Sequence, residues 1–193
     1  DIAIATNDVL DSDDNTVTGG PGADELTGTA GADTFAFNVG DGVAATGSTT
    51  GETVGSAGDT DNGVITFGDG VETITDFDAA EGDTIQFGDE SFSFESGVPS
   101  DVGTFSVGED GTVTLLANNG EELADAGTKF FFAPGSYDAD SGKFTIGSGA
   151  GTNAAFFRYD GDTDQDGRVG VDQIEDIAIA TNDVLDSDDN TVT

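Results

Sequence analysis

A regular run of glycine and aspartate between residues 19 and 36 restricts the folds open to this chain more than any other segment. Residues 19–27 and 28–36 share a nine-residue spacing with early glycines, a sixth-position aspartate and a large apolar eighth residue. The glycines let the backbone turn tightly, and the apolar residue points inward from a short strand. Each copy therefore predicts one turn and one strand, with successive turns stacked on one another. The turn glycines are Gly19, Gly20, Gly22, Gly28 and Gly31, and the inward positions are Val17, Leu26 and Phe35.

The polar positions of the same run have the chemistry of calcium ligands. Asp24 and Asp33 hold the sixth position of the two copies, and a degenerate copy before them supplies Asp13 and Asn15. Carboxylates and turn carbonyls are hard oxygen donors, which suit Ca²⁺. The competing interpretation is a series of glycine- and aspartate-rich loops that binds nothing.

The charge of the chain also needs an explanation. Its 193 residues include 40 acidic and four basic side chains, for a net charge of −36. Such a chain is expected to repel itself strongly at low ionic strength. Disorder is disfavoured because 35% of the residues are apolar and they fall in short strand-like runs. Two compatible explanations remain, namely adaptation to high salt and carboxylates that act as cation ligands.

The nine-residue run resembles the RTX β-roll, the calcium-binding repeat of secreted toxins, adhesins and the C-terminal domains of serralysin-type metalloproteases. The resemblance implies bound Ca²⁺, sites shared between one turn and the next but one, and export by a type I secretion system of a Gram-negative bacterium. In this sequence it implies that Asp13 and Asn15 pair with Asp33. It also implies that Asp24 pairs with the turn around Asp41.

Segments further along the chain are similar to the part that closes the roll in serralysin-like C-terminal domains. They are residues 32–37, 70–77 and 82–87. This similarity implies further acidic ligands, which are Asp69, Asp76, Asp78 and Asp83. Residues 44–63 are interpreted as an inserted surface loop or hairpin, because residues 38–43 are echoed by residues 66–71.

A second candidate calcium loop lies at residues 162–173. It nearly fits the EF-hand loop, with Gly167 at the sharp turn and Gln173 in place of the final glutamate. The predicted ligands are Asp162, Asp164, Asp166, the Arg168 carbonyl, Asp172 and Gln173. Strand-like sequence flanks the loop, so we expect a loop between two strands and not a helix–loop–helix unit. The competing interpretation is a solvated acidic turn.

Residues 85–160 read as short strands separated by turns. Strands are predicted at 92–94, 104–107, 112–115, 129–132 and 143–146, and turns at 109–111, 118–120, 134–135 and 140–142. Phe130, Phe131 and Phe132 are predicted to lie in the core, and residues 120–126 are a short helix candidate. The whole pattern predicts an all-β fold, with a short calcium-binding parallel β-roll that continues into an antiparallel β-sandwich or an extended roll.

The first eighteen residues of the chain occur twice. Residues 176–193 are identical to residues 1–18, at an offset of 175 residues. We interpret this identity as a tandem array with that period, the alternative being a deliberately duplicated segment. The predicted parts are a roll at 1–87, a β-rich part at 88–175 that ends in the calcium loop, and the start of the next repeat at 176–193. The Ile-Ala-Ile-Ala strand at 2–5 and 177–180 is expected to be shared by neighbouring units.

Composition also limits the function. The chain has no His, no Cys and no H-E-x-x-H motif, which removes the usual general base, the thiol nucleophile and the common zinc ligands. Its negative charge argues against ordinary nucleic-acid binding. No run of about 20 apolar residues predicts a membrane span, and no signal peptide is recognisable.

The expected function is therefore structural and not enzymatic. We expect a calcium-stabilised repeat module of a large secreted bacterial protein at the cell surface, in an adhesin, a fibre or a surface layer. Its expected partners are neighbouring repeats of the same protein, with self-assembly as a further option. The alternatives are a glycan- or ice-binding module and the non-catalytic part of a secreted hydrolase.

Overall fold

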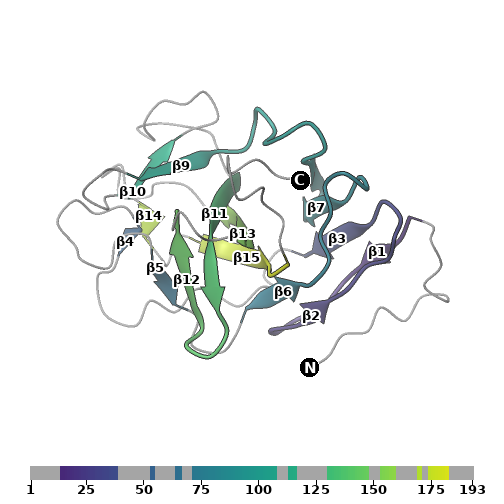
Figure 1. Cartoon of the computed structure of the whole chain (residues 1–193), viewed down its shortest axis with the longest axis horizontal. Coiled ribbons are helices and arrows are strands. Elements are labelled where there is room, and N and C mark those ends of the chain that lie inside the picture. The colour runs from purple at the N-terminus through teal and green to yellow at the C-terminus, as the bar shows by residue number, and fades with distance from the viewer. Residues whose placement is uncertain are drawn as a thin grey trace.

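Strands make up the regular structure of the residues that the structure describes, which contain no helix (Figure 1). The computed structural model describes residues 14–38, 53–54, 64–66, 71–107, 113–116, 130–147, 153–159, 169–170 and 174–182. The all-β prediction is confirmed. Within these segments, no helix is long and apolar enough to cross a membrane. The strands are β1 (Thr16–Val17), β2 (Glu25–Leu26), β3 (Thr34–Phe37), β4 (Thr53–Val54), β5 (Val64–Thr66), β6 (Glu72–Ile74), β7 (Thr84–Phe87), β8 (Glu90–Ser93), β9 (Thr104–Val107), β10 (Val113–Leu116), β11 (Phe130–Asp138), β12 (Lys143–Ile146), β13 (Asn153–Tyr159), β14 (Val169–Gly170) and β15 (Ile174–Ala180).

The nine-residue run forms the first turns of a parallel roll. β1, β3 and β7 pair in parallel in one sheet, and β2 and β6 pair in parallel in another. Each copy of the run forms one strand, as predicted, and successive strands alternate between the two sheets. The eighth-position residues Val17, Leu26 and Phe35 are completely buried, as expected. β8 pairs antiparallel with β7 and ends the four-stranded sheet β1-β3-β7-β8.

The chain leaves the roll between β3 and β6. β5 pairs with β12 at the far edge of the second sheet, and β4 pairs with β14. β4 belongs to the predicted insert at 44–63, and β14 belongs to the predicted calcium loop at 162–173. The helix candidate at 120–126 and the turn candidates at 109–111 and 118–120 lie outside the described residues.

β15 lies in the middle of the second sheet, whose order is β2-β6-β15-β13-β11-β12-β5. It pairs in parallel with β6 and antiparallel with β13, so both of its edges are occupied within this unit. The expected sharing of this strand by neighbouring units would require one free edge. The second copy of the duplicated strand, in β15, has no free edge along its paired residues. This sheet draws strands from all three predicted parts of the chain, 1–87, 88–175 and 176–193. The first copy, at 2–5, lies outside the described residues.

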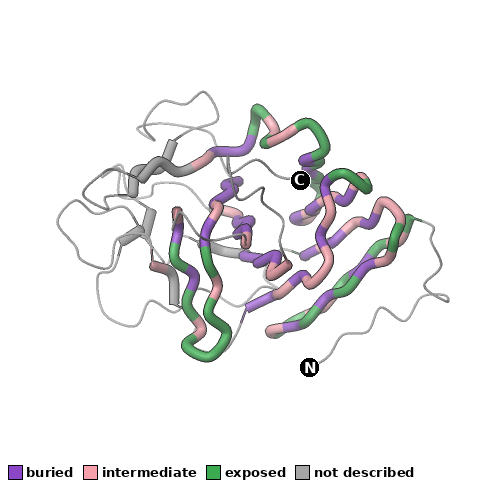
Figure 2. The backbone as a smooth tube through the Cα atoms, in the orientation of Figure 1, coloured by how far each residue is buried: buried purple, intermediate pink, exposed green. Residues whose placement is uncertain are grey.

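The seven-stranded sheet is buried on both of its faces at residues 130–133 of β11, 154–157 of β13 and 177–180 of β15. Phe130, Phe131 and Phe132 are all buried, which confirms the core prediction for this triplet. Ile177–Ala180 are likewise all buried. Alternate residues of a strand point to opposite faces, so a run of buried residues requires cover on both faces. Figure 2 shows this burial along the central strands, whereas the β11–β12 turn is exposed.

The predicted turn at 134–135 is wrong, because Pro134 and Gly135 lie inside β11. The missing side chain of Gly135 lets β12 approach closely. A Cβ atom there would meet the Thr145 carbonyl oxygen at 2.3 Å and the Phe144 ring at 2.6 Å. The Pro134 carbonyl accepts a hydrogen bond from the Gly147 N–H at 2.7 Å. The predicted turn at 140–142 is confirmed and joins β11 to β12.

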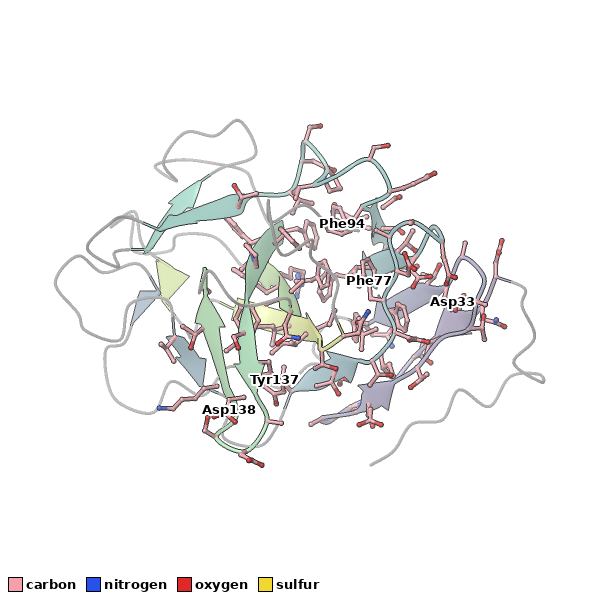
Figure 3. All side chains as sticks on the ribbon, in the orientation of Figure 1. Asp33, Phe77, Phe94, Tyr137 and Asp138 are labelled. Atoms are coloured by element: carbon pink, nitrogen blue, oxygen red, sulfur yellow. The ribbon has the colours of Figure 1, made fainter. Side chains whose placement is uncertain are left out.

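Aromatic side chains fill the space between the two sheets. The Phe77 ring centroid lies 6.3 Å from Phe35, 6.2 Å from Phe94 and 5.3 Å from Phe156. Phe35 belongs to the first sheet and Phe156 to the second, so Phe77 joins them across the core. Figure 3 shows Phe77 and Phe94 in the interior and Asp33 on the roll.

Candidate metal-binding columns of the roll

One column of polar residues follows the turns that precede β1, β3 and β7. The registers pair Thr16 with Thr34 and Thr34 with Thr84, so the preceding residues Asn15, Asp33 and Asp83 stack in successive turns. The Asn15 N–H donates to Asp33 Oδ1 at 2.9 Å, and the Asp33 N–H donates to Asp83 Oδ1 at 2.8 Å. Each carboxylate thus accepts a hydrogen bond from the equivalent residue of the preceding turn. The structure brings Asn15 and Asp33 together, as the resemblance implied.

Asp33 is held in place from its own turn as well. The N–H of Thr29 donates to Asp33 Oδ2, and the Thr29 hydroxyl lies 3.1 Å from the same oxygen. The Asn15 side-chain amide donates in turn to the Thr29 hydroxyl at 3.3 Å. Gly28 makes this packing possible, because a Cβ atom at that position would lie 2.4 Å from Asp33 Oδ2. The deviation from the nine-residue spacing at Thr29 therefore adds a donor to the carboxylate.

A second column lies in the other sheet. Glu25 pairs with Thr73, so Asp24 and Glu72 occupy equivalent positions of successive turns. The Asp24 N–H donates to Glu72 Oε2 at 3.3 Å. The structure therefore places Glu72 beside Asp24, where the resemblance implied the turn around Asp41. The reason is that the chain leaves the roll after β3 and the next strand in this sheet is β6. Asp41 itself lies outside the described residues.

Asp76 and Asp78 occupy the turn after β6. The Gly28 N–H donates to Asp76 Oδ1 at 2.8 Å, which repeats the pattern of a carboxylate that receives an N–H from the preceding turn. The Asp78 N–H donates to Asp83 Oδ2 at 2.8 Å, so both oxygens of Asp83 are hydrogen-bonded. Asp78 Oδ1 accepts from the Ala80 N–H at 2.8 Å. Three of the four acids predicted from the roll-closing segments, Asp76, Asp78 and Asp83, therefore lie around a single turn.

Burial of these carboxylates has an electrostatic cost. Asp24, Asp33, Glu72 and Asp83 are each no more than 5% exposed. Burial is the main reason that the pKa of Asp83 rises from 3.8 to about 6. The N–H groups of Asp78 and Asp33 oppose this rise, whereas the negative charges of Asp33 and Asp76 add to it. Burial also raises the pKa of Asp76, against the Gly28 N–H and together with the charge of Asp33. A neighbouring cation would favour the ionised form of both groups.

A groove of about 700 Å³ runs beside these turns. Its lining includes Thr29, Asp76, Asp78, Glu81 and Asn182. Three of the nine lining residues are acidic and none is basic, so the groove favours cations over anions. Asn182 reaches it from the end of β15 and donates to the Phe77 carbonyl at 2.8 Å. The groove thus brings the residues that follow β15 next to the acidic turns of the roll.

The donor chemistry of the two columns fits Ca²⁺, which prefers carboxylate, amide and carbonyl oxygens. The described residues nevertheless hold no group of three acidic side chains placed to ligate one ion. Their carboxylates instead lie in stacked pairs that accept backbone hydrogen bonds. The predicted ligands outside the described residues are Asp13, Asp41, Asp69, Asp162, Asp164, Asp166, Arg168, Asp172 and Gln173, together with the turn residue Gly167.

Two residues of this network escaped the sequence analysis. Glu72 lacks the glycine-rich turn that marked Asp24 and Asp33, and its alignment with Asp24 depends on the pairing of β2 with β6. Thr29 stands at the second position of the copy 28–36, where the first copy has Gly20. The sequence feature that could have indicated its role is a hydroxyl four residues before an aspartate, because a local hydrogen bond can span that distance.

Comparison of the chain with protein-family models, with curated proteins and with solved structures finds no match.

Proposed function

We propose that this chain is a calcium-stabilised structural repeat module of a large secreted bacterial surface protein. The column of Asn15, Asp33 and Asp83 carries the proposal. It aligns side-chain oxygen atoms at equivalent positions of successive turns, in a chain with a net charge of −36. Buried acids whose pKa is raised gain most from a cation, because the cation removes the cost of ionising them.

The resemblance to RTX β-rolls supports the same proposal. The strands of the nine-residue run, β1, β2 and β3, make parallel pairs, alternate between two sheets and keep the eighth-position residues inside. Binding of Ca²⁺ would then drive folding outside the cell, where the ion is present at roughly millimolar levels. The duplicated eighteen residues support a tandem array, in which such modules act as an extender or a lattice component in an adhesin, a fibre or a surface layer.

A calcium titration tests the proposal. Far-UV circular dichroism and thermal melting are measured in EDTA, with increasing Ca²⁺, and with Mg²⁺ or NaCl at matched ionic strength. We expect β-structure and melting temperature to rise with Ca²⁺ specifically. An equal rise with NaCl would attribute the acidity to charge screening and would overturn the calcium proposal in favour of a salt-adapted surface domain.

Matched variants locate the effect in the column. Asp33→Asn changes a buried carboxylate of the roll, whereas Asp138→Asn makes the same chemical change at an exposed position of β11. Asp33→Asn is expected to need more Ca²⁺ for the same rise in melting temperature, and Asp138→Asn is expected to titrate like the unmodified protein. Identical titrations for all three proteins would argue against ligands in this column.

A row of hydroxyls supports a second candidate, a module that binds ice or glycans. Pairing aligns Thr16, Thr34, Thr84 and Ser93 across the four strands of the first sheet. The Thr34 and Thr84 hydroxyls lie 3.0 Å apart, and none of the four residues is buried. A regular row of hydroxyls on one face of a sheet suits a ligand with a repeating pattern of hydroxyls or waters. Absence of both thermal hysteresis and glycan-array binding in the calcium-loaded protein would exclude this candidate.

A further inference from the structure

The contacts that hold β15 in the second sheet come almost entirely from the duplicated segment. Within residues 176–182, Ile177 to Ala180 are buried, and Ala178 and Ala180 pair with Glu72 and Ile74 of β6. The Thr181 N–H donates to the Ile74 carbonyl at 2.8 Å, beyond the last paired residue of the strand. Residues 1–7 have the same sequence as residues 176–182. A strand formed by residues 1–7 would therefore present the same side chains and the same backbone donors.

The slot between β6 and β13 has room for one strand, whereas the chain contains two copies of the strand that fits it. Only β15 residues before Asp176 make contacts that residues 1–7 cannot repeat, such as the pairing of Ile174 with Tyr159. The two copies therefore differ little in what they gain by entering the slot. Which copy is bound depends mainly on how the chain on either side connects to the roll.

The connection from the first copy is long enough. A strand 1–7 in the slot would end where Asn182 ends, at the groove that Thr29 also lines. The Thr29 hydroxyl accepts a hydrogen bond from the Asn15 side chain at 3.3 Å, so Asn15 lies next to the same groove. Residues 8–14 would span from Asn7 to Asn15, and seven extended residues reach up to about 25 Å. A link within one chain also gives a high effective concentration.

We propose that residues 1–7 are a second closing strand for this slot, interchangeable with residues 176–182 of the same chain. Within the tandem array of the proposed function, on which this extension rests, each unit is then flanked by two identical closing strands. A unit can be closed from the strand before it or from the strand after it. Exchange between the two would couple neighbouring units without any new interface.

Four forms of the full chain in saturating Ca²⁺ test the proposal. The first-copy variant carries Ile2→Asp and Ile4→Asp, the second-copy variant carries Ile177→Asp and Ile179→Asp, and a third variant carries all four changes. The two double variants have the same composition and net charge, so they control for each other. Thermal melting measures the fold, and light scattering coupled to size exclusion measures the mass at several protein concentrations.

We expect the first-copy variant to melt like the unmodified chain. The second-copy variant should stay monomeric and cooperative, with a melting temperature lower by roughly 5–10 °C, whereas the fourfold variant should lose its cooperative transition. Equal melting of the second-copy and fourfold variants would overturn the proposal. A second-copy variant that folds only as a dimer or larger species would assign the slot to another molecule and would overturn closure within one chain. The calcium titration of the unmodified protein tests the proposed function separately.

Discussion

The cation-free protein is expected to lose stability as the pH rises from about 4 to about 7, because Asp83 must then ionise inside the roll. A group whose pKa is higher in the folded state binds its proton more tightly there than in the unfolded chain. Its stabilising contribution is complete below the unfolded pKa and is lost as the pH passes the folded pKa. For Asp83 these values are 3.8 and about 6.

The difference between the two values sets an upper limit of about 3 kcal/mol on the loss. Burial is the main cause of the raised pKa, and the N–H groups of Asp33 and Asp78 already temper it. Solvent at the open side of the turn screens part of the remainder, so we expect a loss of about 1–2 kcal/mol. Bound Ca²⁺ should remove most of this loss, since it favours the ionised carboxylate.

Urea unfolding in EDTA and in Ca²⁺, at several pH values between about 4 and about 7, measures this effect. Asp83→Asn removes the titrating group and should flatten the pH dependence in EDTA. Asp138→Asn is the matched control, because Asp138 is exposed and hydrogen bonds from Ser141 lower its pKa. The reasoning is refuted if Asp83→Asn and the unmodified protein show the same pH dependence in EDTA. Calcium stabilisation at Asp83 is refuted if Ca²⁺ leaves that dependence unchanged.

Three further substitutions test the packing of the roll. Phe77→Ala should lower the free energy of unfolding by about 3–5 kcal/mol, because it removes the ring that joins the two sheets. A loss below about 1 kcal/mol in urea unfolding would contradict this role. Gly28→Ala should cost about 1–3 kcal/mol, since the new methyl group would meet Asp33 Oδ2, Asp33 Cγ at 3.0 Å and the Phe35 ring at 3.2 Å. Its control, Gly20→Ala, meets no atom within 4 Å but has a φ of +97°, so it should cost only about 1 kcal/mol. Asp33→Ala should lower the free energy of unfolding by about 2–5 kcal/mol, because it leaves the Asn15 and Thr29 N–H groups without their acceptor. Chemical denaturation measures this loss. A free energy of unfolding within about 0.5 kcal/mol of that of the unmodified protein would show that water replaces the carboxylate.

Local spacing was sufficient to predict the turns of the roll. Val17, Leu26 and Phe35 lie inside because each nine-residue segment makes its own turn and strand, whatever the rest of the chain does. The resemblance to the β-roll implied the pairing of Asn15 with Asp33, and the structure brings the two residues together because equivalent residues of alternate turns fall in one sheet. The predicted burial of Phe130, Phe131 and Phe132 also holds, because three consecutive phenylalanines have few other stable positions.

Contacts between distant segments decided the rest. Asp83 lies 50 residues from Asp33, and Glu72 lies 48 residues from Asp24, so no local spacing could align either pair. Their alignment depends on where the chain re-enters the roll after its excursion between β3 and β6. The pairing of β6 with β2 and of β7 with β3 sets this re-entry point, and the nine-residue pattern does not encode those pairings.

By itself, the sequence determined an all-β chain, the position and inward side of the first strands of the roll, and an excess of carboxylates, some of them at the turns of the roll. These properties are local, because they depend on residues within one turn of each other. Only the tertiary structure decided that Pro134 and Gly135 continue a strand and that β15 lies between β6 and β13. Both depend on contacts with distant segments, namely the close approach of β12 to Gly135 and the pairing of β15 with β6 and β13, which residues within one turn of each other do not specify.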